Sequence, residues 1–186
     1  MRGSSYRILA MALIGMGTLV LGVVALIALP NSGSSTGTSG ERSVVPVEVD
    51  YPAPELALTD LQGNPVSLAD YLGQVVLVNN WATWCPPCKA EMPTLQDYYD
   101  EHHHQGFTII AIEAGEPVFE VVDFVEQYGL TFVVWPDPTQ SATVAFHNPA
   151  LPSSYLIDRT GSVRLAWTGA IDRTALEKYV TPIVEE

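Results

Sequence analysis

The chain has 186 residues, 47% of them apolar, which is enough to build one ordinary domain around a hydrophobic core. All 21 acidic residues, but only six of the eight basic ones, follow residue 40, so that part of the chain carries a net charge of −15. So acidic a surface would repel a phosphate backbone, which argues against nucleic-acid binding, and two cysteines are too few for a disulfide-stapled mini-protein.

The first 29 residues have the pattern of a membrane anchor. Residues 8–29 are uncharged and mostly apolar, and as a helix they would span roughly 33 Å, close to the thickness of a bilayer core. Arg2 and Arg7 precede this run, so the positive-inside rule places the N-terminus in the cytoplasm and the rest of the chain outside. We therefore expect residues 1–29 to form a cytoplasmic tip and a single-pass signal anchor in the cell membrane. A cleaved signal peptide is the alternative, but the run is long for one and no clear A-x-A site follows.

Residues 30–45 are expected to be a flexible linker. Asn31 to Gly40 consist almost wholly of Ser, Gly and Thr, which cannot bury a core. The folded domain is then predicted over residues 46–186.

The predicted elements of this domain alternate between strands and helices. A hairpin comes first, with Leu56 and Leu61 before the turn at 62–65 and a helical turn at 67–71. Apolar runs and helical spacing next predict a strand over 75–78, a helix to about 105, a strand over 107–112 and a helix over 117–128. A third strand over 132–135 is expected to end at Pro136 and Pro138, and a short helix over 139–146 follows it. The domain is predicted to close with a hairpin over 154–157 and 163–167 and a helix from Asp172. This order predicts an α/β fold with a central mixed sheet flanked by helices.

The pair Cys85 and Cys88 carries the chemistry of the sequence. Cys85-Pro86-Pro87-Cys88 stands where a buried strand passes into a helix, so Cys85 occupies the helix N-terminus. Unpaired backbone N–H groups and the helix dipole favour negative charge there, and hence the nucleophilic thiolate. Prolines fit the first turn of a helix, and the spacing brings both sulfurs close enough to form a disulfide.

A zinc site and a purely structural disulfide are the alternatives for such a pair. Zinc needs further ligands, for which the chain offers His102, His103, His104 and His147. Adjacent histidines point in different directions on a helix and lack the H-x₃₋₅-H spacing, so a solvated helix face is preferred and no metal site is predicted. A disulfide between residues three apart constrains little chain entropy. These arguments favour redox chemistry.

The segment from Trp81 to Pro93, WATWCPPCKAEMP, resembles the thioredoxin superfamily and, more narrowly, its membrane-anchored TlpA/ResA-type reductases. Pro54-Glu55-Leu56, the segment 60–63 and the segment 151–158 match the same group, so the resemblance extends over nearly all of residues 50–186. It implies a thioredoxin fold with an N-terminal β-hairpin extension and the activity of a protein disulfide oxidoreductase.

The resemblance also implies the residues of the site. Cys85 would attack a substrate disulfide, and Cys88 would resolve the mixed disulfide. Glu91 matches a family carboxylate that would exchange a proton with Cys88, about 60° away around the helix, although an ordinary surface acid is the alternative. Pro152 matches the family's cis-proline, which faces the cysteine pair. The residues implied in substrate binding are Trp84, Pro86, Pro87, Leu151 and Pro152.

Two positions depart from the pattern of the superfamily. Asn79 stands where thioredoxins carry a buried acid, so the role of proton acceptor falls on Glu91. Asn80 stands where a large aromatic residue is usual. A peroxiredoxin site is not expected, because its Pro-x-x-x-Thr-x-x-Cys setting is absent.

The implied function is reduction of extracytoplasmic protein disulfides, with the redox-active disulfide as the only redox group and no further cofactor. The resemblance implies apocytochrome c or another extracytoplasmic protein as substrate, and a membrane thiol-electron transporter as donor. A thiol oxidant or disulfide isomerase would use the same residues, and sequence does not fix the direction of electron flow. A non-catalytic metal-binding or chaperone module would not depend on Cys88.

Overall fold

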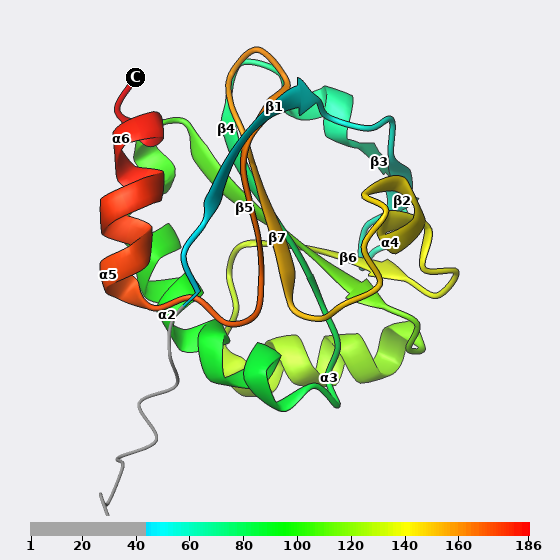
Figure 1. Ribbon diagram of the computed structural model, residues 1–186. Coiled ribbons are helices and arrows are strands. Elements are labelled where there is room, and N and C mark those ends of the chain that lie inside the picture. Colours follow the sequence, from blue (N-terminus) through cyan, green and yellow to red (C-terminus); the bar gives the residue numbers. More distant parts are fainter. Residues whose placement is uncertain (1–43) are drawn as a thin grey trace, which may run out of the picture. The chain divides into compact units, whose positions relative to one another are not determined.

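The computed structural model describes residues 44–186 (Figure 1). The predicted anchor and most of the predicted linker therefore lie outside the described residues. Within residues 44–186, no helix has the length and apolar character that a membrane crossing requires. The backbone N–H of Val44 donates to the carbonyl of Ala170 at 3.3 Å, so contact with the domain begins just before the expected start at Pro46.

A six-stranded mixed sheet lies at the centre of the domain, in the order β1-β8-β7-β4-β5-β6. Neighbours among β4, β5 and β6 are parallel, whereas β7 joins β4, β8 joins β7 and β1 joins β8 in antiparallel fashion. These strands are β1 (Val47–Pro52), β4 (Val75–Trp81), β5 (Phe107–Ala114), β6 (Val133–Asp137), β7 (Ser153–Ile157) and β8 (Ser162–Thr168). The predicted hairpin forms a separate small sheet of β2 (Ala57–Thr59) and β3 (Pro65–Ser67). The predicted mixed sheet is thus confirmed.

Each face of the sheet has its own apolar core, covered by different elements. One face packs against α2 (Pro86–His102), α3 (Val118–Tyr128) and the C-terminal helical segments α5 (Arg173–Ala175), η3 (Leu176–Val180) and α6 (Thr181–Val184). The other face packs against the β2–β3 hairpin, η1 (Leu68–Tyr71) and α4 (Ser141–Ala145). In β4, Val75 and Leu77 enter the first core and Val76 and Val78 the second. Burial on both faces explains why this strand is a continuous apolar run.

Local chemistry explains where two of the helices end or begin. The short helix η2 (His103–Gln105) extends α2 to Gly106, whose φ of 75° ends the helix. The last helix was predicted to begin at Asp172, and the side chain of Asp172 accepts the backbone N–H of Ala175 at 2.8 Å, which makes it the N-cap.

Two edge strands differ from the prediction. Strand β1 was not predicted, although apolar and polar residues alternate from Val47 to Tyr51, which is a strand signal. In the structure its residues are mostly exposed. The predicted end of the third strand at Pro136 is wrong, since Pro136 lies inside β6 and pairs with Glu113 of β5. Strand β6 is at the edge of the sheet, where the N–H group that proline lacks is not needed for pairing with another strand.

Candidate active site

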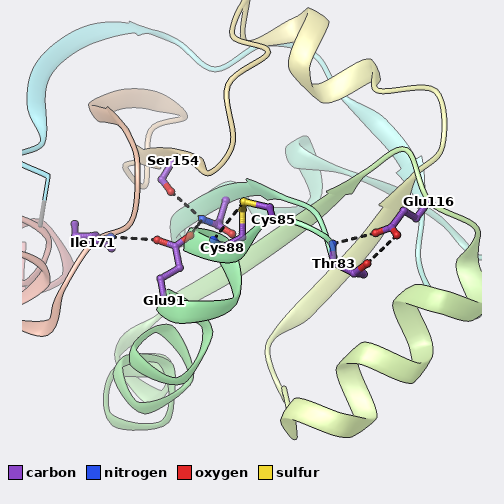
Figure 2. The surroundings of a disulfide bond; sticks show 8 residues. Thr83, Cys85, Cys88, Glu91, Glu116, Ser154 and Ile171 are labelled. Atoms are coloured by element: carbon purple, nitrogen blue, oxygen red, sulfur yellow. Dashed lines mark hydrogen bonds between the residues drawn. A yellow bond between two sulfur atoms is a disulfide. The ribbon is translucent and has the colours of Figure 1, made fainter. Parts of the chain in front are cut away.

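The cysteine pair lies at the junction of β4 and α2 (Figure 2). Cys85 is the N-cap of α2, and its Sγ accepts the backbone N–H of Cys88 at 3.3 Å. The sulfurs are joined in a disulfide with an S–S distance of 2.09 Å and a Cα–Cα distance of 5.3 Å. Cys85 keeps 3% of its surface exposed and Cys88 none, so Cys85 alone of the pair borders solvent. After reduction, the same N–H group would stabilise a thiolate on Cys85.

The residues predicted to bind substrate lie next to Cys85 in the chain or at the same edge of the sheet. Trp84 is 64% exposed, and Pro86 and Pro87 occupy the first turn of α2. The peptide bond between Leu151 and Pro152 is cis, as predicted. Pro152 directly precedes β7, where Ser153 pairs with Asn80 of β4, so it lies at the same edge of the sheet as the cysteines.

Glu91 is buried beside the disulfide, and its two oxygens act as acceptors (Figure 2). Its Oε1 accepts from Asn79 Nδ2 at 2.9 Å, and its Oε2 accepts from the backbone N–H of Ile171 at 3.1 Å. Only 2% of Glu91 is exposed, so the alternative of an ordinary surface acid is wrong. Asn79 also donates to Ser154 Oγ at 3.0 Å, so its side-chain amide links α2 to β7. This is the position at which the resemblance to thioredoxins would place a buried acid.

Comparison with known proteins identifies the family. A profile of the AhpC/TSA family matches residues 49–166. The thiol-disulfide oxidoreductase ResA of Geobacillus kaustophilus is 35% identical over 160 residues, which cover 86% of this chain and 92% of the relative. The chain therefore belongs to the AhpC/TSA family, among the ResA-like thiol–disulfide oxidoreductases.

Further relatives agree with this assignment. A thiol-disulfide oxidoreductase ResA of Bacillus anthracis is 37% identical over 137 residues, 74% of this chain and 79% of the relative. The crystal structure of a putative thiol:disulfide interchange protein DsbE from Chlorobium tepidum has a TM-score of 0.69 at 29% identity, covering 74% of this chain and 99% of that one. The thioredoxin-like fold and the enzyme class, a protein disulfide oxidoreductase, are thus confirmed.

Sequence reasoning left the role of Asn80 open and missed an acidic group beside the redox loop. Asn80 is buried and donates through Nδ2 to Ser153 Oγ at 3.4 Å, next to the cis-proline. Glu113, at the end of β5, is completely buried, and burial raises its pKa to about 8. A charged residue in an otherwise apolar buried strand was the sequence signal that could have revealed it.

The three histidines at the end of α2 and in η2 differ in their surroundings. His102 is buried, stacks on Tyr98 with ring centroids 4.1 Å apart, and its Nδ1 lies 2.9 Å from the carbonyl of Tyr98. The prediction of a solvated face is therefore wrong for His102, whereas His103 and His104 are exposed. Across residues 44–186, no group of three or more His, Cys, Asp or Glu side chains is arranged to hold a metal ion.

Proposed function

We propose that this ResA-like chain reduces disulfides of extracytoplasmic proteins, with Cys85 as the attacking sulfur and apocytochrome c among its substrates. The observation that carries the proposal is the asymmetry of the pair, since Cys85 borders solvent at a helix N-terminus while Cys88 is buried behind it. An incoming disulfide reaches Cys85 first, and Cys88 is left to complete the reaction from inside.

The exchange proceeds in two balanced steps. The Cys85 thiolate attacks one sulfur of the substrate disulfide, forms a Cys85–substrate bond and releases the other sulfur as a thiolate. The Cys88 thiolate then attacks Cys85 Sγ, which closes the observed 85–88 disulfide and releases the second substrate thiolate. Two electrons pass to the substrate, and a membrane thiol-electron donor must return two electrons before the next cycle.

Glu91 is the proposed acceptor of the Cys88 proton. It lies one turn after Cys88 on α2, with both oxygens oriented by donors from other elements, Asn79 and Ile171. The role is assigned to Glu91 because it is a buried carboxylate, held in one orientation, a single helical turn from Cys88. Asn79 acts through Glu91 and is a positioning residue.

The surface around Cys85 suits a polypeptide substrate. Trp84 is 64% exposed beside the sulfur, and Phe119, at the start of the neighbouring α3, is 65% exposed. Exposed aromatic side chains are common anchors in protein recognition. Within the described part of the chain the backbone of Leu151 makes no hydrogen bond, so its polar groups are available to an extended substrate segment.

Residues 1–29 are proposed to anchor the enzyme in the cell membrane, with the catalytic domain outside and the N-terminus in the cytoplasm. The support is the apolar run 8–29 with Arg2 and Arg7 before it, followed by the Ser/Gly/Thr-rich stretch. This arrangement would keep the domain near a membrane electron donor.

Substitution of Glu91 by Gln tests the proton step. The variant is expected to resolve the Cys85–substrate mixed disulfide at least about tenfold more slowly at neutral pH, because the group that accepts the Cys88 proton is lost. The rate is measured by rapid quench with a labelled peptide disulfide, and thermal unfolding checks that the variant is folded.

The matched control is Glu126→Gln, the same change on the exposed surface of α3. It should resolve the mixed disulfide at the wild-type rate. A folded Glu91→Gln variant that also keeps the wild-type rate would remove Glu91 from the mechanism.

A further inference from the structure

The loop that carries Cys85 is tied to the neighbouring β5–α3 loop by a single carboxylate. Thr83 lies between β4 and α2, two residues before Cys85. Its backbone N–H donates to Glu116 Oε2 at 2.9 Å and its hydroxyl donates to Glu116 Oε1 at 2.7 Å (Figure 2). Both oxygens of Glu116 thus fix one residue of the redox loop, and they are the only side-chain acceptors that Thr83 has within residues 44–186.

Behind this contact lies the buried side chain of Glu113. It is fully shielded from solvent at the end of β5, in register with Trp81 of β4. Its Oε2 accepts the backbone N–H of Glu116 at 3.1 Å, while its Oε1 has no partner in the described part of the chain. A buried carboxylate with one oxygen unsatisfied is costly, but a carboxylic acid at this place can donate its proton to a neighbouring carboxylate.

Within residues 44–186, the charged groups that act most strongly on Glu113 are acidic. Glu116 from the β5–α3 loop and Asp137 from β6 act on Glu113 directly, Glu120 of α3 acts on Glu116, and Asp123 acts on Glu120. Burial, aided by Glu116 and Asp137, raises the pKa of Glu113 to about 8. Although burial opposes it, the hydrogen bonds from Thr83 hold the pKa of Glu116 below its usual value. The proton therefore resides on Glu113 and the charge on Glu116.

We propose that Glu113 is a positioning residue whose protonated carboxyl group supports Glu116 and so holds Thr83, Trp84 and Cys85 in place. When Glu113 ionises, its buried carboxylate and the half-buried carboxylate of Glu116 repel each other, and the contact between Glu116 and Thr83 weakens. The redox loop then loses its attachment to the β5–α3 loop. The consequence for catalysis rests on the proposed role of Cys85, but the contact itself does not.

The Thr83 amide signal tests the contact without reference to activity. The oxidised full-length chain is labelled with ¹⁵N-threonine in detergent micelles, and the Thr83 signal is assigned as the one lost in Thr83→Ser. In the wild type this signal should shift in one step with a midpoint near pH 8, the pKa of Glu113. The step should be absent in Glu113→Gln, which stays neutral, and in Glu116→Gln, which lacks the charge.

Glu126→Gln is again the matched control and should keep the step. A Thr83 signal that does not titrate in the wild type, or that titrates equally in Glu113→Gln, would overturn the proposal. The disulfide cannot titrate in the oxidised protein, so the cysteines do not contribute to the step.

Activity provides the second readout. The ratio of disulfide reduction at pH 9 to that at pH 7 should be about threefold higher in Glu113→Gln than in the wild type, because only the wild type loses the contact as Glu113 ionises. Equal ratios would overturn the catalytic part of the proposal. If no variant reduces disulfides while the Thr83 step behaves as expected, the proposed function fails and the contact stands.

Discussion

Replacement of Cys85 by Ser is expected to abolish disulfide reduction, with a loss of at least about 10³-fold in rate. Serine lacks the thiolate that attacks the substrate, and Cys88 cannot replace it because Cys88 is completely buried. The measurement is reduction of a fluorescent protein disulfide by the full-length chain after treatment with a small-molecule reductant.

Cys88→Ser is the matched variant and should fail at a different step. Cys85 can still attack, so the enzyme should accumulate as a mixed disulfide that is visible by mass spectrometry under non-reducing conditions. Full activity of Cys85→Ser would contradict the assignment of the nucleophile. Unchanged activity of Cys88→Ser would favour a module that does not work through the cysteine pair.

The stability of the oxidised protein should fall as pH rises from about 4.5 to 8, because of Glu113. The pKa of Glu113 is raised from 4.5 to about 8 in the folded state, so over this range the unfolded chain has lost a proton that the folded chain keeps. Fewer protons on the unfolded state mean that stability decreases with pH, and the decrease ends above the folded pKa. The free energy of unfolding is expected to fall by on the order of 2–4 kcal/mol between pH 5 and pH 8.

Urea unfolding of the oxidised wild type and Glu113→Gln at several pH values measures this decrease. The free energy of unfolding of Glu113→Gln should not show this decrease. The difference in free energy of unfolding between the two proteins should therefore widen as pH rises toward 8. Two other carboxyl groups have lowered pKa values. For Asp158, hydrogen bonds outweigh the opposing effect of burial, and for Glu101 the cause is the hydrogen bond from Arg173. Their contributions to the free energy of unfolding therefore change only in more acidic solution. Parallel stability curves would show that Glu113 ionises normally in the folded protein.

The redox centre was predictable because its determinants are local in sequence. A buried strand, two first-turn prolines and Cys85 at the N-cap occupy a single continuous segment, and the structure places them as expected. The cis bond at Pro152 also followed, since the motif after it matches the family pattern.

The contacts among the polar groups behind the disulfide depend on strand register and could not be predicted. Asn79 meets Glu91 because β4 and α2 bring positions 12 residues apart together, and it meets Ser154 through the pairing of β4 with β7. Glu116 reaches Thr83 only because β5 lies beside β4, so that the loops after both strands meet at one edge. Side-chain pairs of this kind need three-dimensional neighbours that a linear pattern does not contain.

The reduction potential of the Cys85–Cys88 pair tests the central claim most directly. The full-length chain is equilibrated with mixtures of oxidised and reduced dithiothreitol or glutathione, and the thiols are trapped by alkylation. A dedicated reductant should lie near the thioredoxin value of about −270 mV, so that electrons pass from the pair to substrate disulfides. A potential near about −120 mV, as in strong thiol oxidants, would contradict the reductase function and make the chain a disulfide donor or isomerase.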